Sequence, residues 1–406
     1  MSTDRSSMQA SGKDSSGLLA GAIRIEKIKV EDIYHFASEV LRNLGEKDTI
    51  PIAKHRALAW NSNPHAHADD IGLLVAYVGN TIAGYLGLLP GLLKVHDRFS
   101  KVYWISTWYV APEFRKKSVT LYLIVQALSL KYDLVMSGMS ASAEKVARGF
   151  GFQELGPLNY YVMAMDRLNL IGIFINRFQG FFKKAGLNEG FIEKVHKAGR
   201  YCFQPAKKTL YQILWTSQEK YFQEISYKET TEILPEDRGP QKFPITFHRD
   251  TEIINWMMTY KWILESDDIS LENENYYFSD IRALFRYFAV KIYSSGGQEY
   301  KGFAVVSISS KEQKNVLKLL DFNFVNDKDK KYIFPFLIKY GRDFLAETIV
   351  FPESLLPYCP QGILTQLILQ RRKRFYLAKP SSKTSPLSIA GKDISLNYCD
   401  GDIAFI

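Results

Sequence analysis

One junction between a predicted strand and a predicted helix constrains this chain more than any other segment. Residues 104–128 read WISTWYVAPEFRKKSVTLYLIVQAL: a β-rich apolar run, Ala-Pro, three basic residues, then an apolar stretch without Gly or Pro. This pattern predicts a strand over 101–110 and a helix over 118–132. Arg115, Lys116 and Lys117 therefore fall just before the N-terminus of a helix.

Such a helix N-terminus suits an anion. The first N–H groups of a helix have no partner within it, and the helix dipole adds partial positive charge. Arg115, Lys116 and Lys117 add full charges, and Ser118 and Thr120 add hydroxyl donors. The junction is suited to a pyrophosphate. The equal alternative is a basic turn that only caps the helix.

The residues around this junction predict a mixed α/β domain over 21–166. Residues 23–44 change from alternation to helical spacing, which predicts a strand, a turn at Glu31-Asp32 that caps the next helix, and that helix. Gly79-Asn80 predicts a hairpin turn within 71–97. The elements predicted further along are a short strand (132–140), a helix ending at Gly151 (141–152) and a strand (159–166).

The rest of the chain predicts a connector and a second domain. Residues 167–240 are expected to be a helical connector, and 241–406 a second mixed α/β domain with similar element order. In that domain 310–322 are predicted to form a helix without a basic, Gly-rich loop, and 394–406 a strand. The fold class expected is mixed α/β, with two tandem mixed-sheet domains.

The first residues of the predicted connector form an amphipathic pattern. A basic amphipathic helix over 167–184 can lie on an anionic membrane, and the alternative favoured here is a helix packed between domains. The apolar positions are Leu170, Ile173, Phe174, Phe178, Phe181 and Phe182, beside Arg167, Arg177, Lys183 and Lys184.

Composition narrows the class of protein. The 52 basic and 43 acidic residues give +9, a mild bias toward anionic partners and too weak to indicate nucleic acid. Cys202, Cys359 and Cys399 are too far apart for a Cys-rich zinc site or a disulfide framework, which fits a reducing cytoplasm. Residues 1–20 are expected to be a disordered tail without a secretory signal, and no apolar run is long enough to span a membrane.

Two motifs now carry a family resemblance. Val110, Pro112, Glu113 and Arg115 match the acyl-CoA signature of the GNAT superfamily of N-acyltransferases. A second family motif matches in spacing at Ser140, Ala143, Ala147, Gly151 and Phe152. The resemblance covers about residues 22–166 and implies a GNAT-like fold with acetyl-CoA or another acyl-CoA as co-substrate. The residues it implies for CoA are Tyr109, Val110, Arg115, Lys116, Lys117, Ser118, Val119, Thr120 and Ser140.

The chain departs from the family pattern at four positions, one of which is Ser140 in place of the family Asn. Ser118 and Thr120 replace loop glycines, which let a phosphate approach the backbone, and Ala147 replaces the Tyr that often protonates the leaving thiolate. Tyr160 or Tyr161 on the next strand is a candidate substitute for that acid, and Glu113 is a candidate base. The thioester oxygen is expected to be polarised by the N–H of Tyr109 or Val110.

Two acidic stretches have a weaker pattern. Residues 63–70, NPHAHADD, can place His65 and His67 on one face for a metal, but a solvated loop is favoured and no metal is expected. Asp400 and Asp402 can bind a cationic or hydroxylated acceptor, but exposed acids at a tight turn or strand end are favoured.

The functional expectation is an acyl-CoA-dependent N-acyltransferase. The first domain would hold the acyl-CoA, and the second, without its own CoA loop, would shape a cleft for a small amine such as an amino sugar or a surface-polysaccharide precursor. The alternatives are a catalytically degenerate GNAT-fold scaffold, favoured by Ser118, Thr120 and Ala147, and a peripheral membrane adaptor using 167–184.

Overall fold

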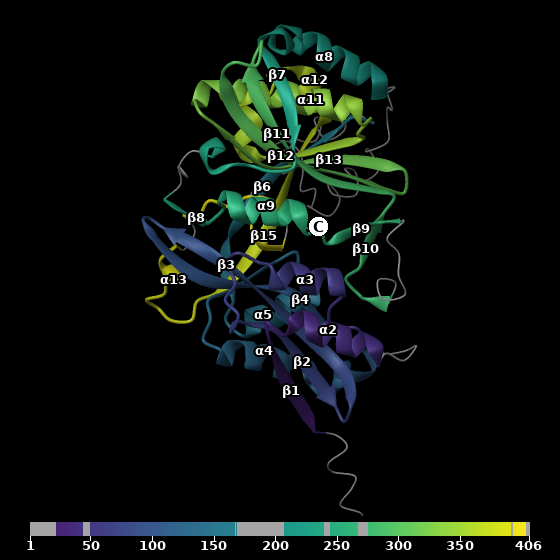
Figure 1. The fold of residues 1–406 in the computed structure, drawn as a ribbon, viewed down its shortest axis with the longest axis vertical. Coiled ribbons are helices and arrows are strands. Elements are labelled where there is room, and N and C mark those ends of the chain that lie inside the picture. The colour runs from purple at the N-terminus through teal and green to yellow at the C-terminus, as the bar shows by residue number, and fades with distance from the viewer. Residues whose placement is uncertain are drawn as a thin grey trace, which may run out of the picture.

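The computed structural model shows two α/β units stacked end to end, with the C-terminal segment between them (Figure 1). It describes residues 22–43, 49–166, 168, 207–238, 244–266, 275–390 and 393–402. The predicted tail, Cys202 and, Leu168 apart, the amphipathic segment 167–184 lie outside the described residues. The prediction of a mixed α/β fold is confirmed.

The first unit follows the predicted order of elements. Its hairpin turns at Gly79, whose φ of +63° is a conformation that favours glycine. Its elements are β1 (Ile23–Lys29), α2 (Ile33–Arg42), α3 (Lys54–Asn61), β2 (Ile71–Val78), β3 (Thr81–Val95), β4 (Arg98–Val110), the 3₁₀ turn η1 (Pro112–Lys117), α4 (Val119–Ser129), β5 (Leu134–Ser137), α5 (Ala141–Gly149) and β6 (Gln153–Ala164).

The predicted cap of the first long helix is wrong. Asp32 occupies the N-cap of α2, but its backbone is already helical and its side chain makes no capping bond. Ile33 and Ala37 are buried on the inner face of the helix instead. Packing of this apolar face therefore holds α2 in place.

The second unit repeats much of this order. Its elements are α8 (Lys207–Glu224), β7 (Ile225–Thr230), the turn η3 (Pro235–Asp237), β8 (Ile245–Phe247), α9 (Thr251–Thr259), β9 (Ile263–Glu265), β10 (Asp280–Arg282), β11 (Leu284–Ser294), β12 (Tyr300–Lys311), β13 (Lys314–Phe324), the turn η5 (Asp327–Tyr332), α11 (Ile333–Asp343), β14 (Thr348–Pro352), the turn η6 (Glu353–Tyr358), α12 (Ile363–Ile368), β15 (Leu369–Lys379) and α13 (Pro386–Ala390).

The helix predicted over 310–322 is wrong, because most of this segment is strand β13. Glu312 and Gln313 both have positive φ, at 52° and 63°, and make a tight hairpin between β12 and β13. Leu317 and Leu319 are fully buried on either side of Lys318. Val316, Leu319 and Leu320 also fit helical spacing, so pairing with β12 decides the outcome.

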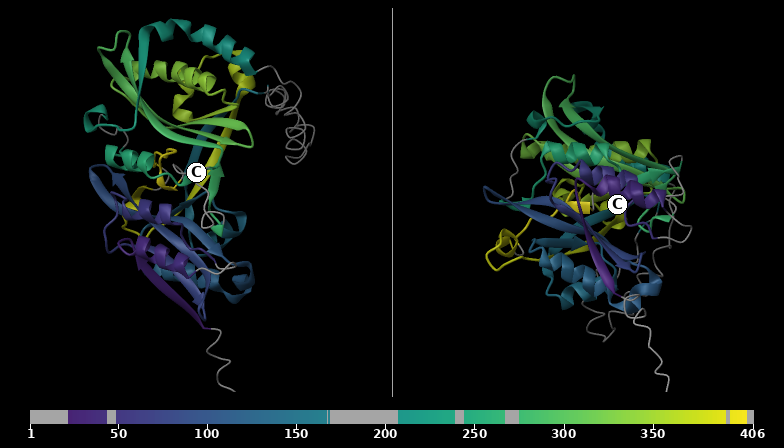
Figure 2. Two further views of the ribbon diagram at one scale, coloured as in Figure 1. Left: turned by 45° about the vertical axis from the view of Figure 1, so that its right-hand side comes forward. Right: turned by 60° about the horizontal axis from the view of Figure 1, so that its bottom comes forward.

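The two units exchange their last strands. One sheet runs β1-β2-β3-β4-β5-β15-β6-β14-β13-β12-β11-β7, with β8 added beside β3. β15, from the second unit, pairs antiparallel with β5 of the first, and β6, from the first, pairs antiparallel with β14 of the second. The turned view shows β15, in yellow, running from one unit into the other (Figure 2, left). The predicted boundaries at 166 and 241 stay a prediction, and the sheet is continuous across them.

Three hydrophobic clusters pack around this sheet. α4 and α5 cover one face of the first unit, with Leu123 fully buried. α8 and α11 cover the outer face of the second, with Phe336 fully buried. The third and central cluster joins Trp60 of α3 and Trp256 of α9 to Phe303 of the second unit. None of the helices in the described ranges is long and apolar enough to cross a membrane.

Candidate functional site

The candidate site begins where β4 and β5 separate. These parallel strands are paired only at Tyr103 with Leu134 and at Trp104 with Val135. The ladder between β3 and β4 continues as far as Val110. The last part of β4 therefore presents an edge to a gap in the sheet rather than to a neighbouring strand.

β4 carries a bulge inside this gap. Trp108 pairs with Leu86 and Ile105 with Leu88, so Ser106 and Thr107 stand opposite the single residue Gly87. A Cβ on Gly87 would lie 2.5 Å from the Thr107 Oγ1 atom, so only glycine fits there. A bulge of this kind redirects side chains and backbone groups at the edge of a sheet.

The backbone N–H of Val110 points into the gap. Ala111 donates its N–H to the Ala83 carbonyl at 3.0 Å, which fixes the alternation of the ladder. Tyr109, two residues earlier, is therefore directed at β3, and Val110 is directed away from it. Of the two residues predicted to polarise a thioester, Val110 has the suitable direction. Its own carbonyl accepts from Arg115 Nε at 3.2 Å.

A six-residue 3₁₀ turn connects the gap to the basic junction. Arg115, Lys116 and Lys117 are exposed, and none of them forms an ion pair with another described residue. Ser118 is in the left-handed conformation, with φ of 61°, and α4 begins one residue later, at Val119. Ser118 thus adopts a glycine-like conformation at the position where the family pattern has glycine.

The first N–H groups of α4 are directed out of the helix. Leu121 and Tyr122 both donate to the Ser118 carbonyl, at 2.9 and 3.1 Å, and these are the first backbone bonds of the helix. Val119 and Thr120 come before them, so their N–H groups lie at the open end. Four of the residues predicted to bind CoA, from Lys117 to Thr120, therefore surround one helix N-terminus.

Ser140 lies at the start of the next helix. It is the N-cap of α5, and its Oγ accepts from the Ala143 N–H at 3.3 Å. Ala147, the counterpart of the family Tyr, is completely buried in the first unit. Ser140 is thus a helix cap, and the Ala147 position supplies no hydroxyl.

The two tyrosines predicted as acids lie away from the gap. β15 stands between β5 and β6, so Tyr160 and Tyr161 pair with Arg372 and Arg371 of β15. Tyr160 meets Tyr398 edge to face at 5.3 Å between ring centroids. Tyr161, on the other face, lines a hollow of about 570 Å³ with residues that include Leu356, Cys359 and Arg371. Glu113 is exposed in η1.

Aromatic side chains line the side of β4 that faces the central cluster. The ring of Tyr109 lies 4.4 Å from that of Tyr277 and 5.5 Å from that of Tyr85. Burial raises the pKa of Tyr85 and, to a smaller degree, of Tyr109, so both stay protonated at neutral pH. Tyr277 and its neighbour Tyr276 come from the second half of the chain and gave no signal in the sequence.

A buried arginine lies behind these rings. Arg56 of α3 is 4% exposed and donates to the Phe278 carbonyl at 2.8 Å. Its guanidinium lies 4.7 Å from the Trp262 ring and 5.3 Å from the Tyr276 ring. No hydrogen-bond acceptor among the described residues meets its Nε.

The C-terminal segment reaches the bulge of β4. Gly401 lies so close to Trp104 that a Cβ would come within 2.2 Å of the indole ring. Asp402 follows beside Ser106 and is 7% exposed. Burial raises the pKa of Asp402 to about 6, while Arg374, Ser106 and Arg56 oppose the rise.

Two predictions for this segment are wrong. It is not a strand, because its described part makes one isolated bridge, between Ser395 and Thr246, and then a turn. Asp400 and Asp402 are not exposed, since both are buried. Contacts with distant parts of the chain, rather than local propensity, fix this conformation.

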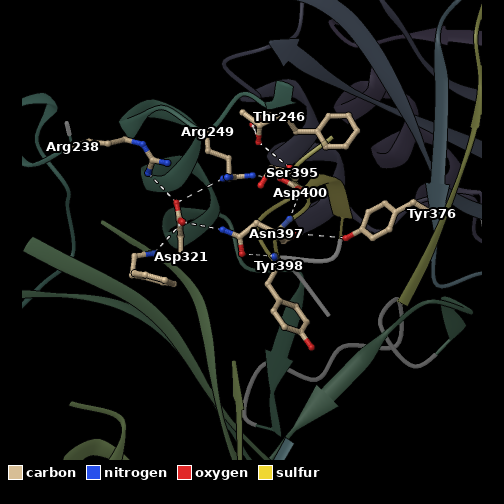
Figure 3. A network of polar contacts seen from close by, with 11 residues as sticks. Arg238, Thr246, Arg249, Asp321, Tyr376, Ser395, Asn397, Tyr398 and Asp400 are labelled. Atoms are coloured by element: carbon tan, nitrogen blue, oxygen red, sulfur yellow. Dashed lines mark hydrogen bonds and ion pairs between the residues drawn. The ribbon is translucent and has the colours of Figure 1, made fainter. Parts of the chain in front are cut away.

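A buried polar network fixes the segment in place (Figure 3). Arg249, just before α9, forms an ion pair with Asp400, and its Nε lies 3.9 Å from Asp321 of β13. Asp321 also accepts from Arg238 at 2.9 Å and from the Asn397 amide at 3.0 Å. Every charge in this network has a partner. It therefore positions Asp402, two residues beyond Asp400, against β4.

The side chains of residues 63–70, the stretch considered for a metal, contact different partners. Asp69 pairs with Lys29 at 2.6 Å, while Asp70 accepts from the Tyr103 hydroxyl at 2.7 Å. His65 faces Asp250 at 3.7 Å. A solvated loop is wrong for His65 and Asp70, which are buried. Among the described residues, no three His, Cys, Asp or Glu side chains gather in a way that could hold a metal.

The comparisons with known proteins give fold similarities alone. No protein-family model matches the chain, and no curated protein matches it. A GCN5-related N-acetyltransferase from Anabaena variabilis ATCC 29413 is similar, with 11% identity, a TM-score of 0.43, and coverage of 89% of this chain and 73% of that one. A conserved protein of unknown function from Enterococcus faecalis V583, described as a probable N-acyltransferase, has 8% identity, a TM-score of 0.43 and the same coverages of 89% and 73%.

A third similar structure is a GCN5-related N-acetyltransferase from Kribbella flavida. It has 10% identity and a TM-score of 0.43, covering 92% of this chain and 74% of that one. Similarity at this level transfers no residue, ligand or activity, so the proposal below rests on the geometry of this chain.

Proposed function

We propose that this chain is an acyl-CoA-dependent N-acyltransferase, with acetyl as the acyl group. The observation that carries the proposal is the gap between β4 and β5, with the Val110 N–H directed into it. This gap leads directly into the basic helix N-terminus at Val119. A thioester and a pyrophosphate are two parts of one acyl-CoA, and the two features would each bind one of them.

The junction would hold the pyrophosphate. The N–H groups of Val119 and Thr120 and the helix dipole attract phosphate oxygens, and Arg115 to Lys117 add exposed cations. The left-handed conformation of Ser118 brings the backbone toward the ligand as a glycine would. The thioester oxygen would accept from the Val110 N–H, which stabilises the negative charge that develops on that oxygen during attack.

Asp402 is the proposed general base. An amine is mostly protonated at neutral pH and must lose a proton before its nitrogen attacks the thioester carbon. With a pKa of about 6, Asp402 is mostly ionised at pH 7 and can take that proton, directly or through a water molecule. The amide bond then forms as the carbon–sulfur bond breaks, and CoA leaves as a thiolate that water can protonate.

The acceptor is proposed to be a small amine, such as an amino sugar or a surface-polysaccharide precursor, acylated in the cytoplasm. One observation supports an alternative, a CoA-binding protein without catalysis. Ala147 is buried where the family has its acid, so no hydroxyl stands at that position. Bound acetyl-CoA without thiol release in the presence of any amine would favour this alternative.

Calorimetric titration of the full-length chain with acetyl-CoA tests the proposal, followed by a thiol-release assay with a panel of amines. We expect micromolar binding and amine-dependent release of CoA. Absence of binding at millimolar acetyl-CoA would overturn the proposal.

A further inference from the structure

Three basic side chains between the units interact electrostatically, and one of them, Arg374, also acts on Asp402. We call them the central cationic cluster: Arg374 of β15, Lys318 of β13 and Arg282 of β10. Arg374 and Arg282 are the charged neighbours that act most strongly on Lys318, and Arg374 is the charged group that acts most strongly on Asp402. The Lys318 ammonium lies 5.8 Å from the centre of the Tyr398 ring.

The cluster has more positive than negative charge. Arg282 is matched by Asp280, which accepts its Nε at 2.7 Å and its Nη2 as well. Arg374 has no such partner: its Nη1 is buried, and no acceptor among the described residues bonds it. Loss of hydration and the nearby arginines lower the pKa of Lys318 to about 8, which still leaves it mostly charged at pH 7.

Asp402 does not neutralise Arg374. The two act on each other electrostatically, but no ion pair joins them among the contacts between described residues. A buried guanidinium nitrogen without an acceptor is costly, and native structures seldom keep one without a purpose. The nearby Arg249 differs, because it forms an ion pair with Asp400 and its Nε lies 3.9 Å from Asp321.

We propose that the acceptor carries an anionic group in addition to its amine, and that Arg374 binds the oxygens of this group with Lys318 adding charge. The amine would then lie toward Asp402 and β4, and the anion toward β13 and β15. The substrate class is a small amine with a carboxylate or a phosphate. The assignment of the amine rests on the proposed function, whereas the anion site rests on Arg374 alone.

Binding of inorganic phosphate tests the anion site without any catalysis. The R115A/K117A chain is the background, because it removes the basic junction as a second phosphate site. We expect phosphate, compared with chloride at equal ionic strength, to raise the melting temperature of this protein. Adding Arg374→Gln should abolish that rise. Adding Arg372→Gln, at an exposed position on the same strand, should leave it unchanged.

Paired acceptors test the substrate class in the otherwise unaltered chain. Glucosamine 6-phosphate is compared with glucosamine, and β-alanine with propylamine, by thiol release from acetyl-CoA. We expect kcat/KM to be about 10- to 100-fold higher for the anionic member of at least one pair. Hydrogen bonds to charged groups contribute a free energy that corresponds to a ratio of this size. The pair that shows the higher kcat/KM for its anionic member identifies the anionic group as a phosphate or a carboxylate. Arg374→Gln should reduce the ratio to about one, and Arg372→Gln should preserve it.

The outcomes separate the two proposals. Phosphate stabilisation that depends on Arg374, without acyl transfer to any amine, supports the anion site and counts against the N-acyltransferase. Acyl transfer with equal rates for neutral and anionic amines, together with no effect of Arg374→Gln on phosphate stabilisation, overturns the anion site. If Arg374→Gln does not fold, Arg374→Lys keeps the charge and should retain at least part of the stabilisation.

Discussion

The two units contain the same strand–turn–helix–strand motif with different chemistry. In the first, β4 leads through the six residues of η1 into the 11-residue helix α4 and then the parallel strand β5. In the second, β13 leads through the six residues of η5 into the 11-residue helix α11 and the parallel strand β14. The backbone plan is shared, so any difference in ligand binding comes from side chains.

The charges at the two helix N-termini differ. The first turn, PEFRKK, leaves Arg115 to Lys117 exposed and without ion pairs among the described residues. In the second, DKDKKY, Lys330 pairs with Asp327 of the same turn at 3.1 Å, and Lys331 pairs with Glu224 of α8 at 3.5 Å. Asp329 is buried beside them. An added phosphate would meet three cations without ion pairs to described residues in the first turn, whereas two of the three lysines in the second turn are paired.

The coverage of the two helices also differs. α11 lies under α8, where the Tyr211 hydroxyl would be 2.6 Å from a Cβ on Gly341. α4 instead exposes Leu121, Tyr122 and Val125, each about half accessible. α11 is therefore covered by α8, whereas part of the surface of α4 remains exposed. Under the proposed function, one backbone plan would serve as a binding site in the first unit and as a structural support in the second.

The largest effect is expected at the network that joins the two units. Arg249→Met leaves Asp400 and Asp321 buried with less positive charge, which should cost about 3–5 kcal/mol of the free energy of unfolding. Because one sheet spans both units, urea unfolding should remain a single transition. The control Arg286→Ala removes an exposed pair with Glu229 and should cost less than about 1 kcal/mol. Two separate transitions in the wild type would show that the units are independent.

The next effect concerns the proposed base, Asp402, which has no counterpart in the second motif. Asp402→Asn should lower kcat/KM by about 10²- to 10⁴-fold at pH 7.5. The carboxylate is the active form, and its pKa is about 6, so the wild-type rate should fall as the pH drops below 6. The rate of Asp402→Asn should not show this fall at low pH. Asp393→Asn, at an exposed position in the same segment, is the control. An unchanged profile in Asp402→Asn would assign the base elsewhere.

Replacing the basic residues compares the two turns directly. The R115A/K117A chain should bind acetyl-CoA about 2–4 kcal/mol more weakly by calorimetry, taking each charge-assisted bond at about 1.5–3 kcal/mol. K330A/K331A, the matched change in η5, should leave the affinity as it is. Equal losses in both variants would mean that net charge, rather than a local site, attracts CoA.

The smallest effect is expected at the left-handed residue of the first motif. Ser118→Gly removes the cost of the left-handed conformation, which is about 1–2 kcal/mol for an L-residue. The glycine, however, loses more conformational entropy on folding, which costs about 0.5–1 kcal/mol. The net result should be a gain of about 0.5 kcal/mol in urea unfolding, with equal or tighter CoA binding. Ser129→Gly at the helical end of α4 should instead destabilise by about 0.5 kcal/mol. Lost CoA binding in Ser118→Gly would make the hydroxyl itself a ligand.

The sequence predicted the parts of the fold that depend on neighbouring residues. The alternation in β1 to β4 and the Gly79 turn are local signals, and the basic residues before α4 are visible because strand, turn and helix are contiguous. β13 was predicted wrongly because Val316, Leu319 and Leu320 fit helical spacing while Leu317 and Leu319 fit strand alternation, and only the partner strand decides. Asp402 was considered as one of two carboxylates that could bind an acceptor, but an exposed acid was favoured, since its burial depends on Arg249 and on β4, about 150 and 300 residues away.

The exchange of β6 and β15 has a consequence for how the chain is made. β15 begins at Leu369, about 200 residues after β6 ends at Ala164. At roughly 5–20 residues per second, a ribosome needs about 10–40 s to cover that distance. During this time the edge of β5 that β15 later covers has no partner, and an open strand edge invites pairing with other chains. Pairings so distant in sequence also form slowly. The newly made first unit must therefore be protected during synthesis, and crowding of ribosomes on one message should favour aggregation of this protein.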